Sequence, residues 1–564
     1  MSKRPNFLFL ITDQQRADWL GCYGHPVLKT PHIDSIAAMG TRFENFHVAS
    51  PVCMPNRASL LTGRYPSVHG LRFNGARLPL SANSFVGQLA DAGYATAAIG
   101  KSHLQPFTGM PPLGARPEDI ERRADAWKPD PGDYGQEEPG RYDADGRYRF
   151  KTPYYGYQHV DMVTSHGDKC GGHYRQWFRE HAPDWQALHD PANQLPHGYS
   201  CPQANRTPVP EDLYPTAYIR DRAIDYLHSR ADEDAPFFAF VSFPDPHHPF
   251  NPPGKYWDMY SPDQFTVPLP YSAHKNPTPA MRWMHENWKG AGGQSTPQTA
   301  TMINDQQIKE AMALTAGMMA FVDDAVGDIL AALDASGQMD DTVICYNSDH
   351  GDYLGDFNML LKGALPFRSI TRVPFIWSDP AHRKAAVTPA LASTVDLAAT
   401  ILDRVGIEPF HGNQGQSFAP ALSGGDGVRD EVLIEYNDGG ARLGFAKPAR
   451  VRALVTAEWR YTIYKDQDWG ELYDLKNDPA ETHNLWDSAD HFATRARMAE
   501  RMNHHLTATQ IGHDQHRCGW IGPTGYGFEL ICPVFLGFGQ FIGDIFSLEK
   551  QGSCGWPPKD MGII

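Results

Sequence analysis

Residues 6–12 have the sequence Asn-Phe-Leu-Phe-Leu-Ile-Thr, and the polar pair Asp13 and Gln14 follows them directly. A short apolar run without polar alternation predicts a β-strand that is buried on both faces. Similar blocks recur along the chain and helix-like stretches precede most of them: strands are expected at 94–99, 237–243, 342–347 and 373–377, and helices at 33–39, 85–92, 216–228 and 306–335. Because strands alternate with helices, we expect an α/β fold with a largely parallel sheet covered on both faces.

Two long segments interrupt this alternation. Residues 105–215 and 251–300 are rich in Pro, Gly, Tyr and Trp and show little periodicity. Irregular segments of this length inside a domain are usually functional loops. Their aromatic side chains could line the mouth of a binding site or anchor the loops in the core. Both interpretations stay open for Tyr154, Tyr155, Trp177 and Trp257.

The pattern changes again near residue 426. Three stretches alternate apolar and polar residues as half-buried antiparallel strands do, at 431–436, 451–455 and 459–464. We therefore expect the main α/β domain at 1–425, an antiparallel subdomain at 426–510 and an apolar, Gly-rich tail at 511–564. A free apolar tail would aggregate, so the tail is expected to pack on a second subunit in a homodimer or homotetramer, or else on its own chain.

The charge balance and hydropathy exclude several classes of function. The 564 residues include 66 acidic and 50 basic side chains, which gives a net charge of -16, and no basic run is long enough for a nucleic-acid face. No stretch of 18 apolar residues free of charge and proline exists, so no membrane-spanning helix is expected. The apolar block 7–11 is too short for a signal peptide. We expect a cytoplasmic protein that binds neither nucleic acid nor membrane.

Polar side chains with ligand or catalytic chemistry follow four of the predicted strands. In chain order they are Asp13 and Gln14, Lys101 and His103, His247 and His248, and Asp349 and His350. The carboxyl ends of parallel strands lie along one edge of a sheet, where open α/β sheets bind ligands. One such pair would usually be only a turn former. Four pairs favour convergence on a single site.

The donor types in this set suit a metal ion. Asp13, Gln14, Asp349 and His350 would supply carboxylate, amide and imidazole ligands to a hard or borderline divalent cation. A structural zinc site does not fit, because no pair of thiolates stands nearby in the sequence. The alternative is that Asp349 and His350 only open a turn before Gly351.

Cys53 stands in an unusual segment, Ser50-Pro-Val-Cys-Met-Pro-Asn-Arg-Ala-Ser-Leu-Leu-Thr-Gly-Arg64. Pro55 suits the first turn of a helix and Gly63 predicts its end. Cys53 would then lie at the positive end of the helix, with Arg57 one turn further on. That environment favours an anion and an activated nucleophile. The alternative is a small buried residue at the start of a core helix.

The same segment resembles the C-x-P-x-R…T-G-R signature of type I sulfatases, members of the alkaline phosphatase superfamily. Further family motifs follow in the same order: Gly100-Lys-Ser-His-Leu104, Pro246-His-His-Pro249, Ser348-Asp-His-Gly351, Lys362 before Arg372-Val-Pro-Phe-Ile376, and Glu471 to Leu485. The resemblance covers residues 5–487. It implies an alkaline-phosphatase-like fold, in which helices enclose a large, mostly parallel sheet and a smaller antiparallel sheet follows at the C-terminal end.

The resemblance also implies how the residues would act. Cys53 would be converted to formylglycine by a separate formylglycine-generating enzyme, and would join Asp13, Gln14, Asp349 and His350 around one metal ion. One hydroxyl of the hydrated aldehyde attacks the sulfur of a sulfate ester and displaces the alcohol, which leaves sulfate bonded to the enzyme. The second hydroxyl then loses its proton, so that the aldehyde re-forms as the C–O bond to sulfate breaks. The implied supporting roles are hydroxyl activation by Arg57, charge stabilisation by Lys101 and Lys362, a base at His103, a leaving-group acid at His247 and a substrate contact at Asn74.

Two departures from the family pattern leave the substrate open. Gln14 and His350 resemble the phosphonate monoester hydrolase and choline sulfatase branches, so the metal is expected to be Ca²⁺ or Mn²⁺. Lys101 and His103 instead resemble true sulfatases, because the phosphonate branch has uncharged residues there. We expect arylsulfatase-type hydrolysis of sulfate monoesters to an alcohol or phenol and inorganic sulfate. The alternative is hydrolysis of phosphonate monoesters or phosphodiesters by the same machinery.

Other classes of protein fit less well. Phosphatases and phosphomutases of the superfamily use Ser or Thr and usually two zinc ions, whereas this chain has Cys53 and ligands for one metal. A binding scaffold without turnover would require an unmodified Cys53. The leaving group is expected to contact the segments 105–215 and 251–300, and His248 is expected to face away from the site into its loop.

Overall fold

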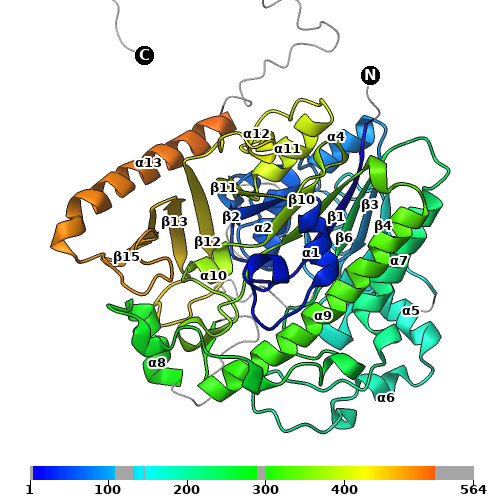
Figure 1. Ribbon diagram of the computed structural model, residues 1–564, viewed down its shortest axis with the longest axis horizontal. Coiled ribbons are helices and arrows are strands. Elements are labelled where there is room, and N and C mark those ends of the chain that lie inside the picture. Colours follow the sequence, from blue (N-terminus) through cyan, green and yellow to red (C-terminus); the bar gives the residue numbers. More distant parts are fainter. Residues whose placement is uncertain (1–3, 108–130, 144–145, 289–299, 515–564) are drawn as a thin grey trace, which may run out of the picture. The chain divides into compact units, whose positions relative to one another are not determined.

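Strand β1 (Asn6–Thr12) lies inside a nine-stranded sheet in the computed structural model, which describes residues 4–107, 131–143, 146–288 and 300–514. The strand order is β11-β2-β10-β8-β1-β6-β3-β4-β5 (Figure 1). The other strands are β2 (Thr41–His47), β3 (Ala95–Gly100), β4 (His159–Thr164), β5 (Gly171–Gly172), β6 (Phe237–Ser242), β8 (Thr342–Ser348), β10 (Phe375–Ser378) and β11 (Ala386–Ser393). Pairing is parallel except where β10 meets β2 and β8 and where β5 meets β4, so the expected mostly parallel sheet is confirmed.

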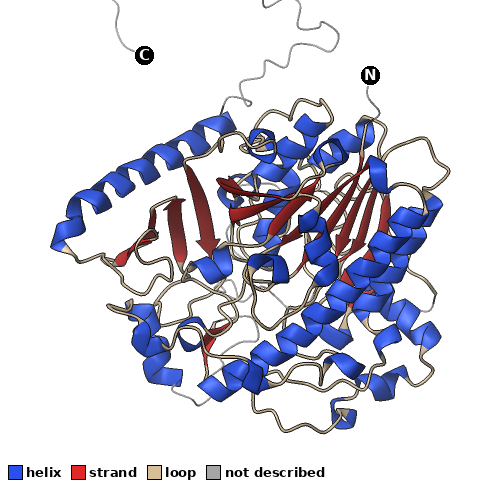
Figure 2. Ribbon diagram, viewed as in Figure 1, coloured by secondary structure: helices blue, strands red, loops and turns tan. Residues whose placement is uncertain are grey.

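Helices cover both faces of this sheet (Figure 2). The α-helices of the described chain are α1 (Pro31–Ala38), α2 (Cys53–Thr62), α3 (Pro66–His69), α4 (Phe85–Asp91), α5 (His173–His181), α6 (Trp185–His189), α7 (Pro215–Ser229), α8 (Pro279–Trp288), α9 (Asp305–Ala335), α10 (Arg368–Thr371), α11 (Asp396–Arg404), α12 (Ala419–Leu422) and α13 (Phe492–Asp514), of which α8 and α13 pack elsewhere. Leu8 and Leu10 of β1 pack in the core formed with α1, α7 and α9. Phe7, Phe9 and Ile11 pack in the core formed with α2, α4 and α11. Successive side chains of β1 therefore fill opposite layers, as a strand buried on both faces requires.

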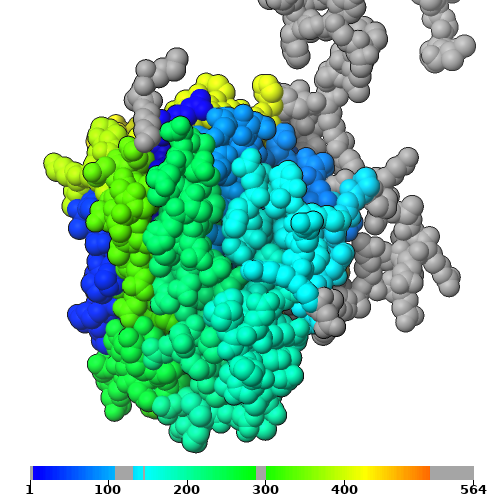
Figure 3. All heavy atoms as spheres, turned by 90° about the vertical axis from the view of Figure 1, so that its right-hand side faces the viewer, coloured from blue at the N-terminus to red at the C-terminus, as the bar shows by residue number. Residues whose placement is uncertain are grey.

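The predicted strands and helices all form, with boundaries displaced by two residues or fewer. Strands β2, β4 and β11 were not predicted, and they lie between or beside the predicted ones. β4 comes from the segment 105–215, which therefore extends the sheet as well as forming loops. Residues 146–288, drawn cyan to green, make up most of the face shown in Figure 3.

The aromatic side chains of the two irregular segments mainly anchor them. Tyr154, Tyr155 and Trp257 are buried in the two large cores. Trp177 is half-buried and packs against the core that contains α7. Of the two interpretations left open by the sequence, anchoring is the one the structure supports for these four rings.

A second sheet follows, as expected for the C-terminal part. Its antiparallel strands are β12 (Glu431–Asn437), β13 (Arg450–Thr456), β14 (Trp459–Tyr464) and β15 (Gly470–Asp474), in that order. Met498 and Met502 of α13 pack against Leu433, Leu454 and Leu472 of this sheet. A small sheet joins β7 (Thr301–Met302) to β9 (Met359–Leu360).

Both larger sheets belong to one compact unit that ends at His513. Residues 515–564, most of the predicted tail, lie outside the described part of the chain. The oligomeric contact expected of this tail therefore stays a prediction. The cytoplasmic location also stays a prediction. Within the described residues, no helix combines the length and apolar character needed to cross a membrane.

Candidate active site

Helix α2 places Cys53 at its first residue. The helix ends at Gly63, which takes the left-handed conformation with φ of 59° that a glycine adopts without strain. Asn56 fixes the turn before the helix, because its Oδ1 accepts hydrogen bonds from the backbone N–H groups of Ala49 (3.0 Å) and Ser50 (3.3 Å). Its Nδ2 donates to the backbone oxygen of Asp349 at 2.6 Å. The start of α2 is thereby tied to the end of β8.

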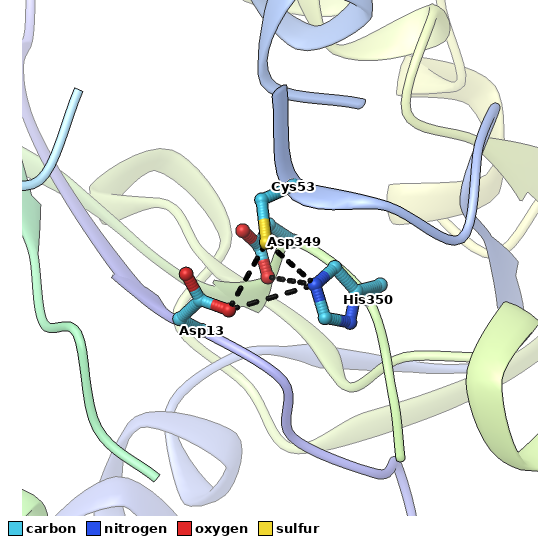
Figure 4. A group of neighbouring side chains, drawn as sticks. All are labelled: Asp13, Cys53, Asp349 and His350. Atoms are coloured by element: carbon cyan, nitrogen blue, oxygen red, sulfur yellow. Dashed lines mark hydrogen bonds and ion pairs between the residues drawn. The ribbon is translucent and has the colours of Figure 1, made fainter. Parts of the chain in front are cut away.

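Four buried side chains point toward one another at this position (Figure 4). Strands β1 and β8 are adjacent and in register through Thr12 and Ser348, so the residues that follow them emerge side by side. Cys53 Sγ lies 3.0 Å from His350 Nε2 and 3.6 Å from Asp13 Oδ1. His350 Nε2 lies 3.5 Å from Asp13 Oδ1 and 3.6 Å from Asp349 Oδ1. The predicted convergence of strand ends is therefore present.

These donors fit a divalent metal ion. One donor atom from each of Asp13, Cys53, Asp349 and His350 lies within 4.8 Å of all the others. Burial alone would raise the pKa of Asp13, but Lys101, Lys362 and Arg57 together hold it well below its usual range. Burial, reinforced by Lys362, lowers the pKa of His350 to about 4. The carboxylate and the neutral imidazole are the protonation states that bind metals.

Gln14 joins the same group with a left-handed backbone, φ of 66°. Its backbone N–H donates to Asp349 Oδ1 at 3.1 Å, and its Nε2 donates to Asp352 Oδ2 at 2.6 Å. Its Oε1 accepts a hydrogen bond from Lys362 Nζ at 2.6 Å. The amide predicted as a metal ligand is thus at the site, where it also orients Lys362.

Three cations surround the carboxylates. Arg57 Nε donates to Asp349 Oδ2 at 2.7 Å, and its Nη1 donates to the backbone oxygen of Lys101 at 2.7 Å. Lys101 Nζ contacts Asp13 Oδ2. Lys362 Nζ lies 3.4 Å from Cys53 Sγ. Although the chain as a whole is acidic, its site contains the local positive charge that binding of an anion requires.

The surroundings of Cys53 raise the pKa of its thiol, which differs from the sequence-based expectation of an activated nucleophile. Burial raises this pKa to about 11, and the neighbouring Asp13 adds to the effect, whereas Lys362 and Lys101 oppose it.

His103 is placed by a strained turn after β3. Its backbone φ is 58°, and Glu137 Oε2 accepts its N–H at 2.9 Å. The imidazole stacks on Phe107 with ring centroids 3.8 Å apart, and its Nδ1 is buried without a partner in the described part of the chain. Burial and then Lys101 lower its pKa well below 6.5. A neutral imidazole of this kind can accept a proton.

His247 has a defined tautomer. Its Nδ1 lies 2.5 Å from the backbone oxygen of His248 and so carries the proton. Its Nε2 then accepts a hydrogen bond from Lys362 Nζ at 2.9 Å. To act as a leaving-group acid, His247 would have to take up a proton at Nε2, and burial, the neighbouring histidines and Lys362 lower the pKa of its imidazole well below the usual range.

Three site residues were missed or misplaced by the sequence analysis. His248 does not face away into its loop: it is buried, and its Nδ1 lies 3.1 Å from Gln14 Nε2. His166 was not predicted, yet its Nε2 lies 2.6 Å from Lys101 Nζ. Glu137 was not predicted either, because nothing in its local sequence distinguishes it from a surface acid. The sequence signal for His166 was its position just after a strand, β4, that had not been recognised.

Asn74 lies at the edge of this group. Its Oδ1 accepts a hydrogen bond from the backbone N–H of Met54 at 3.2 Å, and the residue is half-buried. It is therefore next to the start of α2, where a substrate contact was predicted. All the sequence-predicted site residues are brought to this one edge of the sheet.

The fold is alkaline-phosphatase-like. The crystal structure of the phosphonate monoester hydrolase of Agrobacterium radiobacter superposes with a TM-score of 0.69 and 25% identity, covering 90% of this chain and 96% of that one. The family model described as Sulfatase matches residues 5–132 and 142–407, so the chain belongs to the sulfatase family. A model described as N-sulphoglucosamine sulphohydrolase, C-terminal, matches residues 362–508.

Relatives along most of the chain agree with this assignment. An arylsulfatase of Clostridium perfringens is 27% identical over 499 residues, which is 86% of this chain and 91% of that protein. An uncharacterized sulfatase of Escherichia coli, YidJ, is 30% identical over 506 residues, which is 89% of this chain and 86% of that protein. The chain is thus a sulfatase-family hydrolase, and the resemblance expected from its motifs is confirmed.

Proposed function

We propose that this sulfatase-family hydrolase cleaves sulfate monoesters of the arylsulfatase type, giving an alcohol or phenol and inorganic sulfate. The observation that carries this proposal is the position of Cys53 beside Lys362 and within a buried carboxylate–imidazole group that Lys101 also contacts. Two ammonium groups suit the oxygens of a sulfate ester, whose negative charge they would stabilise. Formylglycine, made by a modifying enzyme, would replace the thiol at position 53, as membership of the sulfatase family and the C-x-P-x-R segment imply.

The metal would be held by Asp13, Asp349, His350 and the side chain at position 53, with Gln14 beside it; Ca²⁺ and Mn²⁺ are the candidates. When bound, it would supply Lewis acidity that lowers the pKa of the attacking hydroxyl. Arg57 holds Asp349 in place through its Nε contact. Lys101 and Lys362 bind and orient the sulfate oxygens.

The histidines would handle protons. His103, neutral and without a partner at Nδ1 among the described residues, is suited to remove a proton in the step that releases sulfate. His247 would deliver a proton to the leaving oxygen after taking one up at Nε2, the atom that accepts from Lys362 Nζ at 2.9 Å here. Removal of one acid or base group typically lowers the rate about 10²–10⁴-fold.

The proposal is tested with two substrates that share one leaving group. We would compare kcat/KM for 4-nitrophenyl sulfate and for the 4-nitrophenyl ester of phenylphosphonate, first with Ca²⁺ and then with Mn²⁺. Mass spectrometry of the peptide containing position 53 would establish that formylglycine is present, and Cys53→Ala would give the background. We expect a clear preference for the sulfate ester and no turnover by the variant.

Phosphonate monoester hydrolysis is the second candidate. Gln14 and His350, which resemble this branch, lie at the metal group, and Asn74, which matches a substrate-contacting Asn of phosphonate monoester hydrolases, is hydrogen-bonded to the start of α2. A structure of a phosphonate monoester hydrolase also shares the fold. A clear preference for the phosphonate in the same assay would overturn the sulfatase proposal in favour of this one.

A further inference from the structure

His166 lies beside the candidate active site but belongs to none of the motifs used so far. It follows β4, after Ser165 with its left-handed φ of 68°. Its Nε2 lies 2.6 Å from Lys101 Nζ, and its ring stacks on that of His247 with centroids 3.5 Å apart and planes 9° apart. It is also the neighbour that, after burial, most lowers the pKa of His247.

The two stacked histidines form a matched pair with the two lysines. His166 Nε2 is placed to accept from Lys101 Nζ, and His247 Nε2 accepts from Lys362 Nζ at 2.9 Å. An ammonium group has only donors, so each facing nitrogen must present its lone pair.

These contacts also indicate which cation lies between Asp13, His166 and His247. Asp13, His166 and His247 bring donor atoms within 4.8 Å of one another, a spacing that could hold a second metal ion. The Nε2 lone pairs of both histidines, and one oxygen of Asp13, are instead directed at ammonium groups. Lys101 is therefore the cation of this half of the site.

A neutral acceptor has a specific advantage beside Lys101. The ammonium has three hydrogens; Asp13 and His166 take two, which leaves one for a ligand. A second carboxylate at position 166 would orient the ammonium equally well, but it would cancel its charge and repel an anionic substrate. A neutral imidazole orients the group without this cost.

We propose that His166 is a positioning residue that accepts a hydrogen bond from Lys101 and so directs the remaining N–H of Lys101 at the sulfate group of the substrate. This inference rests on the proposed function, because it assigns Lys101 to the oxygens of the transferred group. The opposing explanation is that His166 matters only as a flat ring packed on His247.

Two substitutions separate these explanations. His166→Gln keeps a hydrogen-bond acceptor and removes the ring, whereas His166→Phe keeps a ring and removes the acceptor. We expect His166→Phe to lower kcat/KM for 4-nitrophenyl sulfate about 10²-fold, as for loss of one oriented group, and His166→Gln to stay within about tenfold of wild type. His491→Phe is the matched control, since His491 also packs against an aromatic ring, that of Trp459 at 5.9 Å, and lies well beyond the last of the site residues, Lys362, along the chain; it should leave kcat/KM unchanged.

A double-mutant cycle identifies the partner. In a Lys101→Met background, His166→Phe should cost little further activity, because the group it orients is already gone. An undiminished effect of His166→Phe in that background would overturn the proposal, and so would a His166→Gln enzyme that is as impaired as His166→Phe. Metal content and melting temperature are measured on every variant, and if one fails to fold, the other still decides between acceptor and ring.

The leaving group provides an independent check. Because Lys101 acts on the transferred group, His166→Phe should reduce turnover of phenyl sulfate and of 4-nitrophenyl sulfate by the same factor. A larger loss for the poorer leaving group would place His166 in proton delivery and refute the positioning role. If wild type prefers the phosphonate ester, the proposed function fails, but the cycle with Lys101 is then measured on that substrate and still tests His166.

Discussion

At the scale of single residues, Glu137 holds the backbone of His103 in place through a hydrogen bond. This buried carboxylate accepts the backbone N–H groups of His103, Leu104 and Gln105 at 2.9, 3.0 and 3.2 Å, and the hydroxyl of Tyr154 at 2.6 Å. We expect Glu137→Gln to lower kcat at least tenfold, because an amide N–H would then face a backbone donor. Steady-state kinetics and metal content would be measured together.

Tyr154→Phe is the graded comparison for this prediction. It removes one donor to Glu137 and leaves the three backbone donors in place. Its effect on kcat should therefore be smaller than that of Glu137→Gln. If Glu137→Gln retained wild-type kcat, Glu137 would serve only the stability of the segment.

A site residue could be predicted from the sequence when it follows a strand that the sequence itself reveals. Asp13, Lys101, His247 and Asp349 each follow a strand whose apolar run is visible in the sequence, so the parallel sheet alone brings them together. His166 and Glu137 depend on β4 and on segments without hydrophobic periodicity. His247 and His248 are adjacent, so the sequence does not show which of them faces the site. In the structure both contact it, because of the backbone conformation of their loop.

At the scale of elements, Arg460 joins the C-terminal sheet to the main domain. It is buried on β14; its Nη1 contacts Glu471 Oε2 at 2.7 Å, and its Nε contacts Glu481. Glu481 Oε2 in turn accepts the backbone N–H of Arg368 at 2.7 Å, at the start of α10. Arg460→Met would leave two buried carboxylates without their cation, and we expect a loss of about 3–5 kcal/mol of stability.

Denaturant unfolding would measure this loss, with Lys476→Met as control. Lys476 is exposed and lies 3.6 Å from the exposed Glu458, so its removal should cost about 1 kcal/mol or less. Equal losses for the two variants would show that Arg460 contributes no more than a surface ion pair.

Asp323 of α9 caps the start of α1. Its carboxylate accepts the backbone N–H groups of His32 at 3.2 Å and Ile33 at 2.8 Å. Burial nevertheless raises its pKa to about 6 from an ordinary 3.8. The native state then holds this proton more tightly than the unfolded chain, so its contribution to stability is full below pH 4 and is lost as the pH rises to 6.

Asp323→Asn removes this titration and keeps one acceptor. We expect the melting temperature of the variant, relative to wild type, to rise between pH 4 and pH 7, by the equivalent of about 2–3 kcal/mol. Scanning calorimetry across that range would measure the difference. A difference that stays constant with pH would show that Asp323 is ionised throughout.

Strands could be predicted from the sequence where burial on both faces gives them a continuous run of apolar residues. β1, β6 and β8 each contain a continuous apolar run and were recognised, whereas β2 alternates apolar residues with Arg42 and Glu44 in a short run. β11 contains Pro389, which a strand tolerates at a sheet edge, and β11 is an edge strand. Such strands are defined by their neighbours more than by their own composition.

At the scale of the whole molecule, the site is a small positively charged region in a negatively charged protein. The chain carries a net charge of -16. Among the charged groups in direct contact with Cys53, Asp13 or Asp349, the cations Arg57, Lys101 and Lys362 outnumber the two carboxylates by one, and the buried Asp352 lies one contact further out, on Gln14. The positive charge that receives an anion is thus held by buried groups, where salt screens it less than at the surface.

This charge count predicts that metal and sulfate bind cooperatively. A divalent ion would raise the excess positive charge of the site from one to three, so inorganic sulfate should bind more tightly to the metal-loaded protein, and the metal should be held more tightly with sulfate present. We expect a coupling of about 1–3 kcal/mol, seen as a larger rise in melting temperature with sulfate in Ca²⁺ or Mn²⁺ than in a chelator. Asp349→Asn should weaken metal binding and remove the difference, since Asp349 belongs to the metal group. An equal sulfate effect with and without metal would mean that the lysines and Arg57 alone bind the anion.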